Sequence, residues 1–210
     1  LYDWMKAADT TTRVLSVSRK DRGAILPIGR AKADVYWYAS NGLFTTSRYY
    51  RDTLPAWVNA FNARRGPQRL AGRTWTPLLA ADRYAESDSN PLEAGGIDYV
   101  FPHPMPADSA AAARAVKDTP FMDSLTLAFV LAGVRTLGLG ASNARTDLLA
   151  VSLSSTDAVG HKYGPDSKEV HDQVLRVDRY LGAFLDSLQA MRGAGRLIVA
   201  LTADHGVAPY

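Results

Sequence analysis

DLLAVSLS, residues 147–154, is a short apolar run rich in Leu and Val, with the length of a buried strand. A second such run, RLIVALT, occupies residues 196–202 and predicts another buried strand. The segment between the two runs has the periodicity of a helix. Strand, helix and strand in this order are typical of a right-handed unit whose two strands are parallel. The C-terminal third of the chain therefore predicts an α/β fold.

The helix expected between these strands has one apolar stripe. Its apolar residues recur three and four positions apart: Val170, Val174, Val177, Leu181, Phe184 or Leu185, and Leu188. Ser167, with Glu169 in the following turn, is typical of a helix start. Gly193 and Gly195 are typical of a helix end. We expect a helix that begins near residue 167 and ends near residue 193.

Two further segments extend the predicted sheet and its covering helices. TRVLSVS, residues 12–18, has the composition of another strand of the same sheet. The apolar stretch 125–139 carries Arg135 and is too short to span a bilayer. We interpret it as a buried helix that starts near Pro120 and ends near Gly138. The expected fold class is α/β, with a mostly parallel sheet flanked by helices.

The middle of the chain has a different character. Aromatic and β-branched runs lie on either side of Asn41-Gly42, which is a strong signal for a hairpin. Residues 66–108 are rich in Pro, Gly, Asp and Ser, a composition typical of irregular surface structure. We expect an inserted hairpin and loop cap over residues 31–108, and a core, present in part, formed by residues 1–30 and 109–210.

Composition limits the classes of function. The chain has 210 residues, a net charge of +3 and dispersed Lys and Arg residues, so no nucleic-acid surface is indicated. It has no cysteine, so any metal must bind Asp, Glu, His or hydroxyl groups. The chain begins at Leu1 without a signal segment and ends directly after a motif-like segment. We interpret it as an internal fragment of a longer protein.

Two pairs of one carboxylate and one imidazole follow the apolar runs of the C-terminal third. Asp157 and His161 come after the run 147–154, and Asp204 and His205 come after the second run. Ligands bind beyond the carboxyl ends of the strands in open α/β sheets, so we expect both pairs at one sheet edge. Asp and His suit Zn²⁺, Mn²⁺ or Fe, and two adjacent pairs indicate a two-metal site.

A simpler interpretation of each pair stays open, because a lone Asp and His in a loop are usually a cap and a surface imidazole. Lys20 and Arg22 raise a similar question. In extended backbone, residues two apart face the same side, and an ammonium beside a guanidinium suits a dianionic phosphate. The alternative is a solvated charged turn in which Asp21 pairs locally. We expect His103 to lie in a loop and His171 to face solvent.

SSTDAVGHKYGPDSKEVHDQVLRVDRYLG, followed by LIVALTADHGV, resembles the alkaline phosphatase superfamily, which includes phosphodiesterases and nucleotide pyrophosphatases. The resemblance covers roughly residues 1–30 and 115–210. Within the superfamily, VSRKDRGAILPIGRAKADVYWYASNGLFTTSRYY resembles the bacterial periplasmic, phosphate-irrepressible zinc alkaline phosphatases. This resemblance implies a periplasmic or secreted enzyme that acts on a small-molecule phosphate ester.

The resemblance also implies roles for particular residues. Asp157 and His161 match ligands of one Zn²⁺, and Asp204 and His205 match ligands of the other. Lys20 and Arg22 match the pair that holds phosphate oxygens.

The resemblance places the threonine nucleophile, a further Asp ligand and a further His ligand outside this chain. It therefore implies monoester hydrolysis through a covalent phospho-enzyme in the intact protein, with the fragment itself inactive. The alternatives are a nucleotide pyrophosphatase or phosphodiesterase, a sulfatase, or a non-catalytic metal-binding fragment.

Overall fold

A computed structural model describes residues 1–193 and 195–207, and the chain divides into two compact units. Unit 1 consists of Leu1–Arg69 and Asp123–Ser154, and unit 2 of Leu70–Met122 and Ser155–Tyr210. Each unit has its own sheet and its own cluster of buried apolar side chains.

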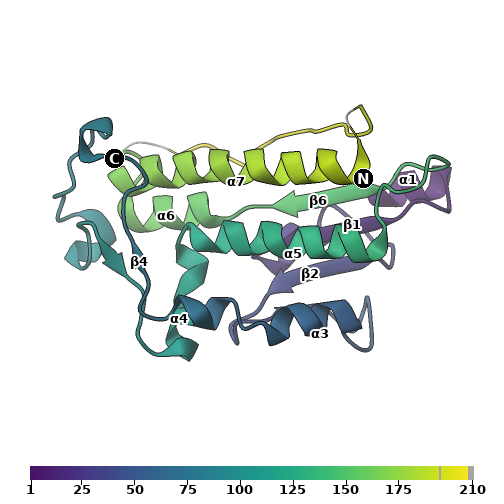
Figure 1. Cartoon of the computed structure of the whole chain (residues 1–210), viewed down its shortest axis with the longest axis horizontal. Helices are drawn as coiled ribbons and strands as arrows, with labels where there is room; N and C mark the ends of the chain where they lie inside the picture. The colour runs from purple at the N-terminus through teal and green to yellow at the C-terminus, as the bar shows by residue number, and fades with distance from the viewer. Residues whose placement is uncertain (194, 208–210) are drawn as a thin grey trace. The chain divides into compact units, whose positions relative to one another are not determined.

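The sheet of unit 1 has four strands in the order β3-β2-β1-β6 (Figure 1). Their bounds are Val14–Ser18 for β1, Asp34–Tyr38 for β2, Phe44–Thr45 for β3 and Leu148–Ser152 for β6. β1 pairs in parallel with β2 and β6, and β3 is antiparallel to β2. The strands expected within residues 12–18 and 147–154 are confirmed, as is the α/β class with a mostly parallel sheet.

Helices cover both faces of β1. The helices of unit 1 are α1 (Tyr2–Ala8), α2 (Asp21–Ile25), α3 (Ala56–Ala63) and most of α5 (Phe121–Leu137). On one face the Ser16 hydroxyl donates a 2.6 Å hydrogen bond to the carbonyl of Ala24 in α2. On the other face α5 lies so close that a Cβ at Gly133 would come within 2.6 Å of Leu15 Cδ2. Successive side chains of a strand point to opposite faces. Because both faces of β1 are covered, every residue of this strand is buried.

Phe129 of α5 is the centre of an aromatic cluster in unit 1. Its ring stacks on Phe44 at 4.0 Å between centroids, and it meets the edge of Tyr36 at 5.6 Å. Trp57 and Phe61 of α3 lie 4.8 and 5.1 Å from the same ring. Aromatic pairs at these separations add about 1 kcal/mol each beyond the area that they bury. The cluster therefore fixes α3 and α5 on the β2–β3 hairpin.

The hairpin expected around Asn41-Gly42 is confirmed, but its first strand lies inside the main sheet. β2 and β3 are joined by a turn in which the Ala39 amide donates to the Leu43 carbonyl over 2.9 Å, and Gly42 has φ of 83°. We expected this hairpin in a cap outside the core, yet β2 is the parallel neighbour of β1. A strand buried on both faces needs two partners, and β2 supplies one of them to β1. The interpretation of residues 31–108 as an insertion stays a prediction.

The buried helix expected over residues 125–139 is confirmed as α5, which begins at Phe121 and ends at Leu137. Among the described residues, no single helix combines the length and apolarity of a membrane span, although residues 109–118 and 121–137 meet both criteria when counted together as a bent pair.

Unit 2 contains two packed helices and a two-stranded antiparallel sheet. The helices are α6 (Ser155–Tyr163) and α7 (Lys168–Arg192), and the strands are β4 (Thr74–Trp75) and β5 (His103–Pro104). The shorter elements are η2 (Ala81–Arg83), η3 (Glu93–Gly96), α4 (Ser109–Ala115) and η4 (Val116–Asp118), while η1 (Pro67–Leu70) lies at the boundary with unit 1. The short turns between residues 70 and 108 match the irregular structure that their composition predicts.

Helix α7 has the expected bounds, and its expected apolar stripe is buried at Phe184 and Leu188 but not in the first turns. Its N-cap is Ser167, whose hydroxyl accepts a hydrogen bond from the Val170 amide, and the helix ends at Gly193 with φ of 92°. Val174 of the expected stripe is 51% exposed. Polar residues are buried in its first turns instead: Glu169, Asp172 and Gln173. Apolar spacing therefore located the helix but misjudged which face of its first turns is buried.

The strand expected over residues 196–202 is wrong. The structure assigns no strand to the described residues from 195 to 207, and Ile198 and Leu201 are exposed. An extended segment becomes a strand only when its backbone N–H and C=O groups pair with a neighbouring strand. Apolar composition predicted the segment's preference for burial, but it could not supply that neighbour.

Candidate functional site

Asp157 and His161 lie on helix α6, whereas the sequence predicts them in a loop directly after a strand. β6 ends at Ser152, and α6 begins three residues later. An acid in the first turn and a base in the last turn both interact favourably with the helix dipole, so the two residues suit a helix of this length. Their spacing of four residues places both side chains on one face of α6.

Asp204 and His205 follow an irregular segment, so the expected sheet edge does not position them. The structure nevertheless brings both pairs together in unit 2. The Nε2 atom of His161 lies 3.3 Å from Asp157 Oδ1, and Nε2 of His205 lies 3.7 Å from the same oxygen. The Oδ2 atom of Asp204 is 3.7 Å from Nε2 of His205. One carboxylate oxygen of α6 is thus shared by two imidazoles.

Solvent exposure differs sharply within this group of four residues. The side chain of Asp157 is 25% exposed, whereas those of His161 and His205 are 79% and 55% exposed. Asp204 is 90% exposed. Asp157 is therefore the least exposed of the four candidate ligands, and the other three side chains lie largely in solvent.

The chemistry of these donors suits a borderline metal ion such as Zn²⁺, which binds imidazole nitrogen and carboxylate oxygen. Across residues 1–193 and 195–207, however, no three His, Cys, Asp or Glu side chains are arranged so that they could hold an ion. The fit to a metal thus rests on donor chemistry and proximity. The assignment of Asp157, His161, Asp204 and His205 as ligands stays a prediction.

Lys20 and Arg22 lie in unit 1, where the chain leaves the carboxyl end of β1. Lys20 has extended backbone, as the sequence predicts, but Arg22 already lies in a helix. Lys20 is the N-cap of α2, with its amide donating a 3.0 Å hydrogen bond to the Ser18 hydroxyl, and Arg22 is in the first helical turn. The expectation that both cations face one side stays a prediction, as does their role in phosphate binding.

Gly23 allows α2 to pack closely against the sheet. A Cβ at this position would lie 2.5 Å from Ser18 Oγ and 2.9 Å from Ser152 Oγ, closer than real Cβ contacts. Glycine lets the helix rest directly on the carboxyl ends of β1 and β6. Asp21 in the first turn further favours the helix through its dipole. Lys20 and Arg22 are thus held at the carboxyl edge of the parallel strands.

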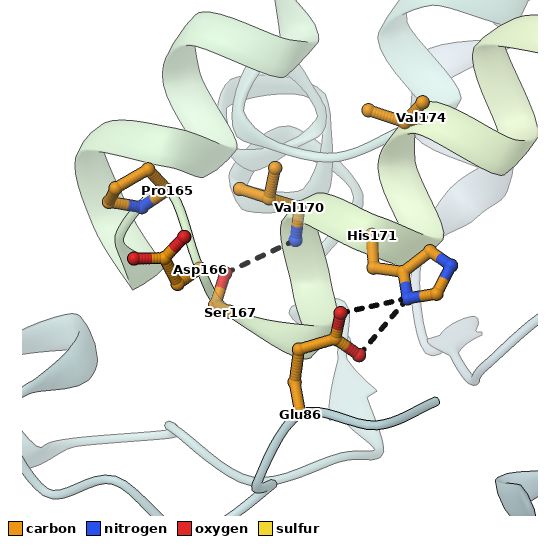
Figure 2. A pocket seen from close by; sticks show the side chains of 7 residues that line it. All are labelled: Glu86, Pro165, Asp166, Ser167, Val170, His171 and Val174. Carbon is orange, nitrogen blue, oxygen red and sulfur yellow. Dashed lines mark hydrogen bonds and ion pairs between the residues drawn. The ribbon is translucent and has the colours of Figure 1, made fainter. Parts of the chain in front are cut away.

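A pocket of about 370 Å³ lies at the turn between α6 and α7 (Figure 2). Pro165, Asp166 and Ser167 form one side of it, while Val170 and Val174 of α7 form an apolar wall. Figure 2 shows Glu86 and His171 meeting at the rim of the same hollow. The turn that carries the pocket continues directly from the helix of Asp157 and His161.

His171 is half-buried and paired, which corrects the expectation that it faces solvent. Its Nδ1 atom lies 3.1 and 3.0 Å from the two carboxylate oxygens of Glu86. Burial acts to raise the pKa of Glu86, but the hydrogen bond with His171, backbone hydrogen bonds and the charge of His171 together outweigh burial and lower the pKa of this carboxyl below its ordinary value. The pair fixes the loop around residue 86 on α7.

His103 is also buried, although its Pro-rich surroundings predict a loop. Its Nδ1 lies 3.2 Å from Asp98 Oδ1, and its Nε2 lies 2.7 Å from Glu169 Oε1. Trp75 and Tyr163 contact the imidazole ring, with centroids at 5.3 and 4.9 Å. Histidine 103 is therefore part of the interior of unit 2.

Asp172 is a second buried carboxylate of α7 and lies about one turn after Glu169. It accepts hydrogen bonds from Trp75 Nε1 at 2.6 Å and from the Tyr84 hydroxyl at 2.7 Å, and Arg176 Nε lies 2.6 Å from it. The sequence contains a signal for this polar face. Glu169, Asp172 and Arg176 recur at helical spacing of three and four, the same periodicity that marks an apolar stripe. Apolar periodicity alone does not detect a buried face of this kind.

Comparison with known proteins identifies the family of the chain. The family model described as type I phosphodiesterase / nucleotide pyrophosphatase matches residues 4–210. The chain belongs to this family. The superfamily resemblance of the sequence motifs is thereby confirmed.

Two curated relatives of this type I phosphodiesterase / nucleotide pyrophosphatase chain are named as alkaline phosphatases. PafA of Elizabethkingia meningoseptica is 39% identical over 209 residues, which cover 96% of this chain and 38% of PafA. PhoV of Synechococcus elongatus is 41% identical over 206 residues, which cover 95% of this chain and 37% of PhoV. The chain thus spans less than two-fifths of the length of these relatives.

A crystal structure of wild-type PafA is similar to the chain in fold. The match has a TM-score of 0.82 at 36% sequence identity and covers 93% of this chain and 39% of that one. Together with the named relatives, it supports a phosphoesterase hydrolase at the level of the family.

Proposed function

We propose that this chain provides part of the active site of a zinc-dependent hydrolase of phosphate monoesters that acts through a covalent phospho-enzyme. The names of the relatives support the monoesterase class. The single observation that carries the proposal is the shared carboxylate of Asp157, whose Oδ1 lies 3.3 Å from His161 and 3.7 Å from His205. The two motifs are 43 or more residues apart on the chain, and this carboxylate is where their donor groups meet.

Asp157, His161, Asp204 and His205 would hold the metal. Zn²⁺ supplies Lewis-acid stabilisation of a phosphoryl or alkoxide oxygen and lowers the pKa of a bound hydroxyl group. Lys20 and Arg22 would neutralise the charge on the phosphoryl oxygens that the metal leaves free. By the same resemblance, the substrate is a small phosphate ester, and the protein acts in the periplasm or outside the cell.

A phosphodiesterase or nucleotide pyrophosphatase is the second candidate. The description of the matching family model favours it, since that description names these activities. The two candidates share the metal ligands and differ in the charge of the substrate. Lys20 and Arg22 distinguish them, because a monoester carries one more negative charge than a diester.

The proposal is tested with the chain itself and with a chimaera in which it replaces the matching segment of PafA from Elizabethkingia. We expect the chain alone to bind Zn²⁺ weakly, without turnover of p-nitrophenyl phosphate, and the chimaera to bind Zn²⁺ and turn over. Asp157→Ala should weaken Zn²⁺ binding at least tenfold, as loss of a ligand does. Asp178→Ala, on the exposed face of α7, is the matched control and should change neither quantity.

Two results would overturn the proposal. Zinc affinity and turnover that survive Asp157→Ala in the chimaera would remove this residue from the metal site. Zinc binding that depends on Asp157 in a chimaera without any turnover would favour the non-catalytic metal-binding alternative.

A further inference from the structure

A second hollow of about 470 Å³ lies in unit 1, at the amino ends of two parallel strands. The register of β1 against β2 pairs Leu15 with Asp34, so the segments that enter both strands lie side by side. Helix α1 and the threonine run 10–12 close the hollow from the N-terminal side. This end of the sheet is opposite to the end where Lys20 and Arg22 lie, and the five residues of β1 put about 16 Å between the two ends.

The lining of this hollow is strongly cationic. Four cations and one carboxylate line it: Lys6, Arg13, Lys32, Arg51 and Asp34. Asp34 is already engaged, because its Oδ1 accepts hydrogen bonds from Arg51 Nη2 at 2.5 Å and from the Tyr36 hydroxyl at 2.8 Å. The one carboxylate can therefore offset little more than the charge of Arg51. The net positive charge of the lining stays unbalanced.

Two of these cations have N–H donors that make no hydrogen bond to any described residue. Among the described residues, Lys32 has no hydrogen bond or ion pair through its ammonium group, and Arg51 Nε is buried without an acceptor. A buried donor that lacks an acceptor is unfavourable, and the loss is recovered when a ligand provides one. An anion in the hollow would supply an acceptor to the Lys32 ammonium, whereas Arg51 Nε is closed off from solvent and would become accessible only if its side chain shifted.

The frame around these donors is fixed in advance. The Tyr2 hydroxyl donates a 3.0 Å hydrogen bond to the Thr12 carbonyl, and Lys6 donates to the carbonyls of Thr10 and Thr12. Asp9 accepts from the amide and hydroxyl of Thr11 at 2.8 and 2.7 Å, which holds the threonine run in a turn. A preformed frame lowers the entropic cost of binding a ligand.

We propose that this hollow, between α1, the threonine run 10–12 and the amino ends of β1 and β2, is a binding site for a small phosphate-type oxyanion. A planar guanidinium and an ammonium in one polar hollow match the several oxygens and double charge of a phosphate group. The ligand is inorganic phosphate or the phosphate group of a small ester. The inference does not depend on the proposed function, since it uses none of the predicted metal ligands and neither Lys20 nor Arg22.

Titration with inorganic phosphate tests the site, using amide chemical shifts of the chain at low ionic strength with EDTA present. We expect saturable shifts at residues 10–14 and 32–34, and affinity that falls as salt screens the charges. Lys32→Gln should weaken phosphate binding about fivefold, and Lys32→Arg should restore it to within twofold. Arg48→Gln, an exposed cation of unit 1 outside the lining, is the matched control and should leave the affinity unchanged.

A parallel titration with glycerol phosphate distinguishes the two sources of the ligand. Tighter binding of the ester than of phosphate assigns the site to esters, and the reverse order assigns it to the free ion. No saturable shift with either ligand, shifts confined to other residues, or equal weakening by Arg48→Gln would overturn the proposal.

Discussion

Nε2 of His103 lies 2.7 Å from Oε1 of Glu169, and both side chains are buried in unit 2, with Glu169 fully enclosed. The second oxygen of Glu169 has no hydrogen-bond partner among the described residues, nor has Oε2 of Glu93 nearby. Burial, reinforced by the charge of Glu169, raises the pKa of Glu93. The interior of unit 2 thus contains polar groups whose contributions to stability can be measured one by one.

Removing one member of the buried pair should destabilise the protein strongly. Glu169→Ala leaves Nε2 of His103 without its partner inside an apolar and aromatic environment, and we expect a loss of about 3 kcal/mol in the free energy of unfolding. Urea denaturation measures it. Asp98→Ala is the matched control, because Asp98 contacts the same imidazole but is 40% exposed, and it should cost less than about 1 kcal/mol. Equal losses in the two variants would contradict the importance of burial here.

Glu93→Gln should stabilise the protein at neutral pH. Because the folded pKa of Glu93 is raised, the contribution of its neutral form is complete below the ordinary Glu pKa of about 4.3 and is lost as the pH rises through the folded pKa. Glutamine keeps an acceptor for Asn90 Nδ2, now 3.2 Å from Oε1, without the charge. We expect about 1 kcal/mol of added stability at pH 7 and little difference near pH 4.

Glu86→Gln should change the stability at pH 7 in the opposite direction to Glu93→Gln. The pKa of Glu86 is lowered, so its contribution is present above the ordinary Glu pKa and is lost as the pH falls. Glu86→Gln should therefore reduce stability at pH 7, where Glu93→Gln increases it. Denaturation curves at both pH values compare them, and a loss of stability at pH 7 in Glu93→Gln would contradict the assigned shift.

Gly23 should tolerate no side chain. A Cβ there would lie 2.5 Å from Ser18 Oγ, so Gly23→Ala must displace α2 or the serine, and we expect a loss of about 2 kcal/mol in thermal or urea unfolding. Gly182→Ala is the control, since it lies in the interior of α7 with nothing within 4 Å, and alanine should stabilise that helix by about 0.5–1 kcal/mol. If Gly23→Ala proved neutral, the packing of α2 on the sheet would be looser than described.

The sequence predicted those elements whose signals are local. β1, β6, α5 and α7 have long apolar runs or stripes, and caps such as Ser167 and Gly193 mark their limits. The segment 196–202 has a comparable signal but forms no strand, because strand formation depends on a partner that no local pattern specifies. The same limit applies to β2, whose place beside β1 follows from the whole sheet.

For the candidate site too, local patterns identified the residues but not the elements that carry them. Residue types and spacing singled out Asp157, His161, Asp204 and His205, and the structure brings them together. The reason given for their meeting was incorrect, since α6 and an irregular segment carry them. The sequence predicts His103 to lie in a loop, because a Pro-flanked histidine has no pattern of its own and its partner Glu169 is 66 residues away.

Lys20 and Arg22 provide the prediction that separates a monoesterase from a diesterase. A monoester phosphoryl group has two negative charges, and a diester replaces one charged oxygen with an ester group, so a second cation there meets no charge. In the PafA chimaera, Lys20→Ala and Arg22→Ala should each lower kcat/KM for p-nitrophenyl phosphate by about 100-fold, the scale of a charge-assisted contact made in the transition state. The loss for bis-p-nitrophenyl phosphate should be much smaller, and zinc content should not change.

Lys20 and Arg22 lie on either side of the first residue of α2, so a double variant can test whether they act on the same phosphoryl group. Lys20 is the half-buried, extended N-cap, whereas Arg22 is exposed in the first turn. If both side chains reach one phosphoryl group, their effects should be coupled, and the double variant should lose less than the sum of the two single losses in activation free energy. Arg30→Ala, an exposed cation of unit 1 away from this turn, should leave both substrates unaffected. Equal losses for monoester and diester would make the pair structural, and the phosphodiesterase function would then be the better-supported one.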